Sequence, residues 1–227
     1  MTQAEFRELI LLEVRKFLPE VPSWDDMARF VRISGAPVSS PDNLDYSTAM
    51  TNVERAAFRK YASILEHERA SVITNKNAGD PSTNIDNFYL LTVEDLAIAK
   101  GHNQPEPRIY PLKTVSRPPY HASGRTYRYL WAQAGNVVTI YPTPNEDYTL
   151  FLTGVVYPHY DSGQLVAVTP GDEYTLARYI AAEFLEPFNP QITQVWRQEA
   201  ITEWVLERQK RAWSRHFKGR NVLRRVF

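Results

Sequence analysis

The histidines are the first residues to examine for chemistry, because metal ligands and acid–base pairs commonly include them. No two of the five histidines lie within five residues of each other, so the local spacing typical of metal ligands is absent. The chain has no cysteine, which excludes disulfides, thiolate metal sites and cysteine nucleophiles. The histidines are His67, His102, His121, His159 and His216. We therefore predict no metal site and no cofactor.

Paired carboxylates are the next candidates for catalysis. Asp25–Asp26 and Asp172–Glu173 each stand at the start of an expected helix, where acidic side chains stabilise the helix dipole. The sequence contains no G-x-S-x-G elbow, Walker loop, G-x-G-x-x-G turn or H-E-x-x-H pair. These observations favour a protein that is not an enzyme.

The C-terminal segment is the stronger lead. Residues 208–227 carry eight Lys/Arg and no Asp/Glu, whereas the first 207 residues carry 18 Lys/Arg against 26 Asp/Glu. An acidic body with a basic end indicates a charged partner. Arginines interspersed with large apolar side chains are typical of protein interfaces, which predicts a docking segment. Its candidate docking residues are Arg211, Trp213, Arg215, Phe217, Arg220, Arg224, Arg225 and Phe227.

Two other interpretations of this segment stay open. It could be a solvated, frayed terminus without a partner. It could also bind nucleic acid, since arginine and aromatic side chains contact phosphates and bases. The acidic body argues against direct DNA binding, because only the basic segment would attract a polyanion.

Helices are expected at both ends of the chain. Thr2 and Glu5 have the spacing of a capping box and begin the first helix. Apolar residues at helical spacing predict a second, long helix from about Tyr46 to Thr74. Thr169 as cap and Pro170 at the first position predict the start of another helix. A last helix is expected over about 191–217, and 218–227 has no helical pattern.

The middle of the chain reads as strands. The segments "RTYRYLWAQ" and "NVVTIYP" are expected to form a hairpin across residues 134–136. A further strand is expected from Tyr148 to Tyr157, forming a second hairpin with the strand at 137–141 across a bend at Pro142 and Pro144. A short helical turn is expected at Val93–Asp95. The proline-rich stretch 101–124 is expected to be a long, functional loop.

Together these elements predict an α+β fold. It consists of a helical bundle formed by the N- and C-terminal helices, with an inserted antiparallel β module and an extended C-terminal tail. The expected parts are N-terminal helices at 1–78, the β module with its long loop at 79–165, C-terminal helices at 166–217, and the basic tail at 218–227. The sequence contains no run of about 18 apolar residues, so no membrane-spanning segment is expected. We expect the protein to stay in the cytoplasm in which it is made.

The order and spacing of several segments resemble the head-to-tail adaptor (connector) proteins of tailed bacteriophages. The resemblance covers roughly residues 2–187 and is carried by "FYLLTVEDLAIA", "YRYLWAQAGNVVTIYPTPNEDYTLFLTGVVYP" and "VTPGDEYTLARYIAAEFLEPF". It implies a non-enzymatic ring of twelve copies in the virion, at the portal vertex where head and tail meet, assembled in the host cytoplasm. Such a ring attaches to the portal protein and extends the channel through which packaged DNA passes. It also provides the platform for a tail or nozzle protein.

The resemblance gives the basic segment and the long loop an expected partner each. The basic segment is expected to dock on the portal. The long loop is expected to face the tail, through Arg108, Tyr110, Arg117, Tyr120 and His121. Two alternative functions remain: a nucleic-acid-binding protein that uses the basic segment, and a carbohydrate-binding tail module that uses the aromatic side chains of the strands.

Overall fold

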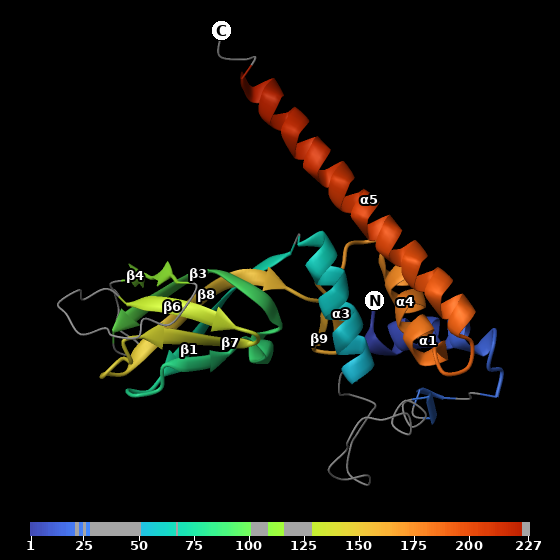
Figure 1. The fold of residues 1–227 in the computed structure, drawn as a ribbon, viewed down its shortest axis with the longest axis horizontal. Helices are drawn as coiled ribbons and strands as arrows, with labels where there is room; N and C mark the ends of the chain where they lie inside the picture. Colours follow the sequence, from blue (N-terminus) through green and yellow to red (C-terminus); the bar gives the residue numbers. More distant parts are fainter. Residues whose placement is uncertain are drawn as a thin grey trace. The chain divides into compact units, whose positions relative to one another are not determined.

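The computed structural model describes residues 1–20, 23–24, 26–27, 51–66, 68–100, 109–115 and 129–223, with side chains up to residue 213. The chain divides into two compact units. A helical unit comprises Met1–Leu65 and Pro158–Phe227, and a β unit comprises Glu66–Tyr157. The fold is mixed α+β, as the sequence predicts (Figure 1). The division falls after residues 65 and 157, whereas the sequence analysis placed the boundaries of the β module after residues 78 and 165.

Helices from both ends of the chain pack together in the helical unit. Its elements are α1 (Gln3–Arg15), α3 (Asn52–Leu65), β9 (His159–Asp161), β10 (Gln164–Val166), α4 (Glu173–Leu185) and α5 (Pro190–Leu223). α1 begins with the predicted capping box, in which Thr2 and Glu5 exchange hydrogen bonds. α4 packs against α1, α3 and α5. The fully buried side chains at this centre include Phe6, Phe58, Leu176, Ile180 and Trp204.

Both C-terminal helices differ from the prediction at one end. α4 begins at Glu173 and not at Pro170, and the carboxylate of Asp172 accepts a hydrogen bond from Tyr61 instead of capping the helix. α5 continues to Leu223, so residues 218–223 are helical and not extended. Gly219 costs such a helix only about 1 kcal/mol, and its neighbours are good helix formers. Residues 224–227 lie outside the described residues. No helix of the described part combines the length and the apolar character needed to cross a membrane.

The second helix is shorter than the sequence predicts. α3 ends at Leu65, and β1 (Arg69–Lys76) follows where the helix was expected to continue to Thr74. Three consecutive β-branched residues, Val72, Ile73 and Thr74, favour a strand, and pairing with a neighbouring strand overrides the helical spacing of the apolar positions. Residues 46–50, where this helix was expected to begin, lie outside the described residues.

The described residues of the β unit form two four-stranded sheets and one short 3₁₀ helix. One sheet has the order β1-β8-β3-β4 and the other the order β2-β7-β6-β5. Pairing is antiparallel throughout except between β5 and β6. The remaining elements are β2 (Ser82–Asn84), η1 (Ile85–Phe88), β3 (Leu90–Lys100), β4 (Ile109–Pro111), β5 (Lys113–Thr114), β6 (Leu130–Ala134), β7 (Val137–Tyr141) and β8 (Tyr148–Val156). Leu96, Ile98, Leu152, Trp131 and Ile140 bring buried side chains from both sheets into the core.

Two expectations for the strands are corrected. The hairpin β6–β7 is confirmed, but β7 and β8 do not form a second one, because they belong to different sheets. β8 is paired on both edges, with β1 and with β3, so it has no edge left for β7. The helical turn expected at Val93–Asp95 lies within β3, at a place where the pairing register with β8 shifts. Such a bulge accommodates a local break in the strand pattern without ending the strand.

Candidate functional site

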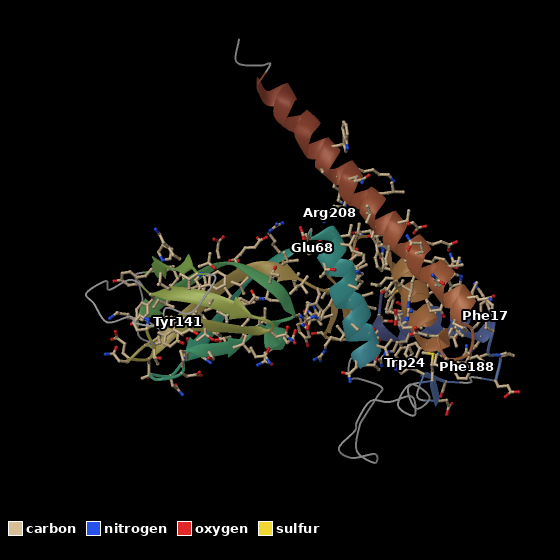
Figure 2. The ribbon with its side chains drawn as sticks, viewed as in Figure 1. Phe17, Trp24, Glu68, Tyr141, Phe188 and Arg208 are labelled. Carbon is tan, nitrogen blue, oxygen red and sulfur yellow. The ribbon has the colours of Figure 1, made fainter. Side chains whose placement is uncertain are left out.

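The second half of α5 contains most of the residues predicted to dock on a partner. Arg211 and Trp213 have described side chains; positions 215, 217 and 220 belong to the helix, but their side chains lie outside the described set. Arg224, Arg225 and Phe227 lie outside the described residues altogether. In Figure 1, α5 runs past the other helices of its unit toward the C-terminus, and Figure 2 labels Arg208, the first residue of the basic segment.

Arg211 has a structural role that the sequence did not reveal. Its guanidinium donates to the hydroxyl of Thr169 at 2.9 Å and to the carboxylate of Glu207 at 3.2 Å. The backbone N–H of Thr169 in turn donates to the hydroxyl of Tyr61 at 3.1 Å. Arg211 therefore fastens α5 to the turn before α4, and through Tyr61 to α3. A contact between residues 42 positions apart in the chain leaves no local signal in the sequence.

Tyr61 is the centre of this anchor. Its hydroxyl donates to the carboxylate of Asp172 at 2.8 Å, and its ring meets the ring of Trp204 edge-on at 5.2 Å. Burial raises the pKa of the Tyr61 phenol well above its ordinary value, and the nearby Asp172 carboxylate adds to the increase. The phenol therefore stays neutral at physiological pH and acts as a fixed hydrogen-bond donor.

Trp213 differs from Arg211 in its surroundings. Its side chain is 66% exposed, although tryptophan is among the most buried residue types by area. Val205 and Leu206, within the preceding two turns, are also exposed. The first part of α5 contains Glu199, Glu203 and Glu207, so the helix changes from acidic to basic at residue 208. Trp213 is therefore a largely exposed candidate docking residue, whereas Arg211 is bound to Thr169.

The residues predicted to face the tail belong to the part of the sequence that makes up the β unit. Of these, the structure describes Tyr110, which is in β4 and 45% exposed. Arg108, Arg117, Tyr120 and His121 lie outside the described residues. Tyr110 lines a pocket of about 790 Å³, whose described lining consists of Lys100, Tyr110, Pro111, Leu112, Lys113, Tyr129 and Pro142. This lining offers cations and aromatic rings, and Lys100 is already paired with Glu146. The described lining includes no carboxylate and no histidine, and so offers no acid–base pair.

The most buried charged pair of the described residues is Arg7 and Glu54, in the helical unit. The guanidinium contacts both oxygens of the carboxylate, at 3.0 and 3.1 Å, and the side chain of Glu54 is fully buried. Tyr160 donates to Glu54 Oε1 at 2.6 Å, and the backbone N–H of Thr51 donates to Oε2 at 2.7 Å. Arg7 also stacks on the ring of Trp24, 4.6 Å from its centroid; Figure 2 labels this tryptophan. Each carboxylate oxygen is already satisfied, so this cluster holds α1, α3 and β9 together and does not serve as an acid or base.

Within the described ranges, no three side chains of the His, Asp and Glu types come together in a way that could hold a metal ion. A scan against models of known protein families and a search of curated proteins both found no match. The function is therefore inferred from the residues and from the structure of each unit by itself.

Proposed function

We propose that this protein is a structural head-to-tail adaptor of a tailed bacteriophage. Twelve copies form a ring that attaches to the portal protein, extends the DNA channel and provides the platform for a tail or nozzle protein. In this proposal the helices of both chain ends form the bundle of each subunit. The protein is not an enzyme, and it acts in the virion, at the portal vertex, after assembly in the host cytoplasm.

One observation carries the proposal: α5 continues beyond its anchor at Arg211 and exposes a tryptophan there. Arg211 fastens the helix to Thr169, and the helix continues to Leu223. At about 1.5 Å per residue, the twelve residues after Arg211 extend the helix by about 18 Å. A helix that leaves its own core with an exposed aromatic side chain and many cations fits insertion into a partner protein.

The charge distribution supports the same function. A net negative body suits a channel wall, because DNA slides past a surface that does not bind it. Cations near the C-terminus of α5 are favourable there because they face the negative end of the helix dipole. A partner surface with acidic side chains would replace the solvent around these cations and fix the orientation of the helix.

The test is attachment to the portal protein of the same phage. Both proteins are co-expressed, and their complexes are purified and viewed by negative-stain electron microscopy. We expect ring-shaped complexes with the full-length chain and none with a chain truncated after Ala212. This truncation keeps Arg211 and its bond to Thr169, whereas truncation after Lys210 would also remove the anchor of α5.

A single substitution separates docking from general damage. Trp213→Ala is expected to weaken attachment to the portal at least tenfold, because interface tryptophans commonly contribute 2 kcal/mol or more, roughly, to binding. Phe188→Ala is the matched control, since Phe188 is 49% exposed and lies before α5. Attachment that survives the truncation would contradict the docking role of α5. A truncation-sensitive affinity for DNA that falls steeply with salt, without portal binding, would favour the nucleic-acid-binding alternative.

A further inference from the structure

β1 is a long edge strand of the β unit. It pairs with β8 along its full length, and among the described residues no strand pairs with its other edge. Arg69 and Lys76 stand at the two ends of the strand, and the residues between them include no charged residue, no proline and no glycine. Ile73, at its middle, is 65% exposed. Edge strands of natural proteins are commonly protected by charges, prolines or bulges, so an unprotected one indicates a strand that pairs with something.

The hydrogen-bonding groups at this edge can be assigned from the register. The N–H of Val156 donates to the carbonyl of Glu68 at 3.1 Å, which makes residues 68 and 156 a hydrogen-bonded pair. Because such pairs alternate along an antiparallel ladder, residues 70, 72, 74 and 76 direct their backbone groups toward β8. The backbone groups of Ser71, Ile73 and Asn75 therefore point to the open edge.

The other described edges of the two sheets are blocked or short. The N–H of Leu112 donates to the carbonyl of Leu96, which directs residues 110 and 112 toward β3 and leaves Pro111 at the outer edge of β4. Pro111 has no N–H to offer, so it interrupts any further ladder there. β2 has three residues and follows Pro81, and β5 has two. Among the described edges of these two sheets, β1 is therefore the one that suits a second copy of the chain.

We propose that β1 pairs with β1 of a second copy in an antiparallel, two-fold arrangement centred on Ile73. In this register Ile73 faces Ile73 of the second copy, and Ser71 faces Asn75. Each of these pairs joins residues whose backbone groups point to the open edge, so the ladder can form without moving β1. The terminal cations are staggered: Arg69 faces Asn77 and Lys76 faces Ala70, so no two like charges are opposed.

The outer face of the sheet favours this occupant over an unrelated strand. Ile73, Phe151, Ala97 and Pro111 are directly paired across all four strands, so their side chains form one apolar row on one face. Pairing Ile73 with its counterpart joins two such rows into one stripe that is symmetric about the contact. Strand pairing alone buries less area than a standard interface, so the dimer should be weak, with a dissociation constant roughly in the micromolar range.

This inference goes beyond the proposed function and does not depend on it. A two-fold contact uses the same patch on both copies, whereas neighbours in a cyclic ring contact each other through two different patches. The β1 contact is therefore a property of free copies, separate from the contacts that close a ring.

The test uses distances between two copies of the same label. The chain has no cysteine, so Ile73→Cys and Ile109→Cys each provide one attachment point for a nitroxide on the full-length protein. In the dimer, the Cα atoms of the two residues 73 should lie about 5.5 Å apart, as in any hydrogen-bonded antiparallel pair. Residue 109 lies on β4, and the two copies of it should be roughly 35 Å apart across eight strands. Strong dipolar broadening at position 73 and its absence at position 109 are the expected result.

A second measurement protects the test against an effect of the label. Sedimentation over a range of concentrations should give a dimer whose dissociation constant rises at least tenfold in Ile73→Lys and stays unchanged in Ile109→Lys. Both isoleucines are exposed and lie on edge strands of one sheet, which makes them a matched pair. A chain that stays monomeric, or a dimer indifferent to Ile73→Lys, would overturn the inference. If free copies show no short distance at position 73 but the same protein still forms portal-bound rings, the inference is overturned and the adaptor function is left standing.

Discussion

The buried pair of Arg7 and Glu54 permits a quantitative prediction. Glu54 is fully buried and Arg7 is 5% exposed, so the two charges compensate each other almost without water. Arg7→Met removes the cation while keeping a long apolar side chain against Trp24. The carboxylate then keeps its bonds from Tyr160 and Thr51 but loses its counter-charge. Removing one partner of such a pair typically costs about 3–5 kcal/mol, and we expect Arg7→Met to destabilise the helical unit by this amount.

Urea unfolding followed by tryptophan fluorescence measures this loss. Trp131 belongs to the β unit, so a Trp131→Phe background leaves tryptophans only in the helical unit. With a slope of about 2 kcal/mol per molar urea, a loss of about 4 kcal/mol lowers the midpoint by about 2 M. All variants are compared at the same, near-neutral pH.

Two further variants decide whether burial is the cause. Arg15→Met breaks the pair of Arg15 with Glu8 on the same helix, whose side chains are 30% and 53% exposed, and should cost no more than about 1 kcal/mol. Arg7→Met combined with Glu54→Gln should recover most of the loss, because a neutral amide needs no counter-charge: its oxygen accepts from the N–H of Thr51, and its NH₂ group donates to the hydroxyl oxygen of Tyr160. If Arg7→Met costs no more than Arg15→Met, the reasoning is refuted.

Two predictions concern the β unit. Gly154→Ala should destabilise it by about 3 kcal/mol or more in urea unfolding, because an added Cβ would lie 1.9 Å from the carbonyl oxygen of Thr92. In Gly79→Ala the added Cβ would meet no atom within 4 Å, so the variant should be destabilised only by roughly 1 kcal/mol, because its backbone is in the left-handed conformation. Equal destabilisation in the two variants would contradict a steric overlap at Gly154. Burial raises the pKa of Tyr148 to about 12, so its phenol ionises at a lower pH in the unfolded chain than in the folded protein. The contribution of this neutral phenol to the free energy of unfolding is fully present below pH 10 and is lost as the pH rises toward 12. Between pH 8 and pH 11, ionisation of Tyr148 should lower the free energy of unfolding by about 1.4 kcal/mol. Tyr148→Phe should abolish this part of the pH dependence, as measured by urea unfolding followed by circular dichroism. A pH dependence that is the same in the variant would refute the role of Tyr148.

The sequence predicted those elements whose signals are local. The capping box of Thr2 and Glu5 and the hairpin around Gly135 depend on residues a few positions apart, and both are present. The predicted helix to Thr74 failed because β1 is stabilised by pairing with β8, about 80 residues later in the chain. Helical spacing of apolar residues cannot compete with such a ladder, and the sequence alone does not indicate that the ladder exists.

In the candidate site, too, the sequence indicates local features but not tertiary contacts. The composition of the C-terminal segment made Trp213 a candidate docking residue, and its side chain is largely exposed. The composition was not enough to separate Trp213 from Arg211, whose bond to Thr169 depends on tertiary packing. Tyr110 was predicted in a loop and lies in β4, at a pocket whose described walls come from strands and connections between residues 100 and 142.

The bond between Val156 and Glu68 has a consequence for how the chain is built. It brings the first and last residues of the β unit next to each other, so the β unit begins and ends at one place. Because the ends of the β unit are adjacent, its insertion into the helical unit requires only a short distance between Leu65 and Pro158. It follows that residues 66–157 can be exchanged for a short linker, or for another domain with adjacent ends, without changing the path of the helical unit. Folding of the insert also shortens the loop that the two halves of the helical unit must close, which lowers the entropy cost of bringing them together.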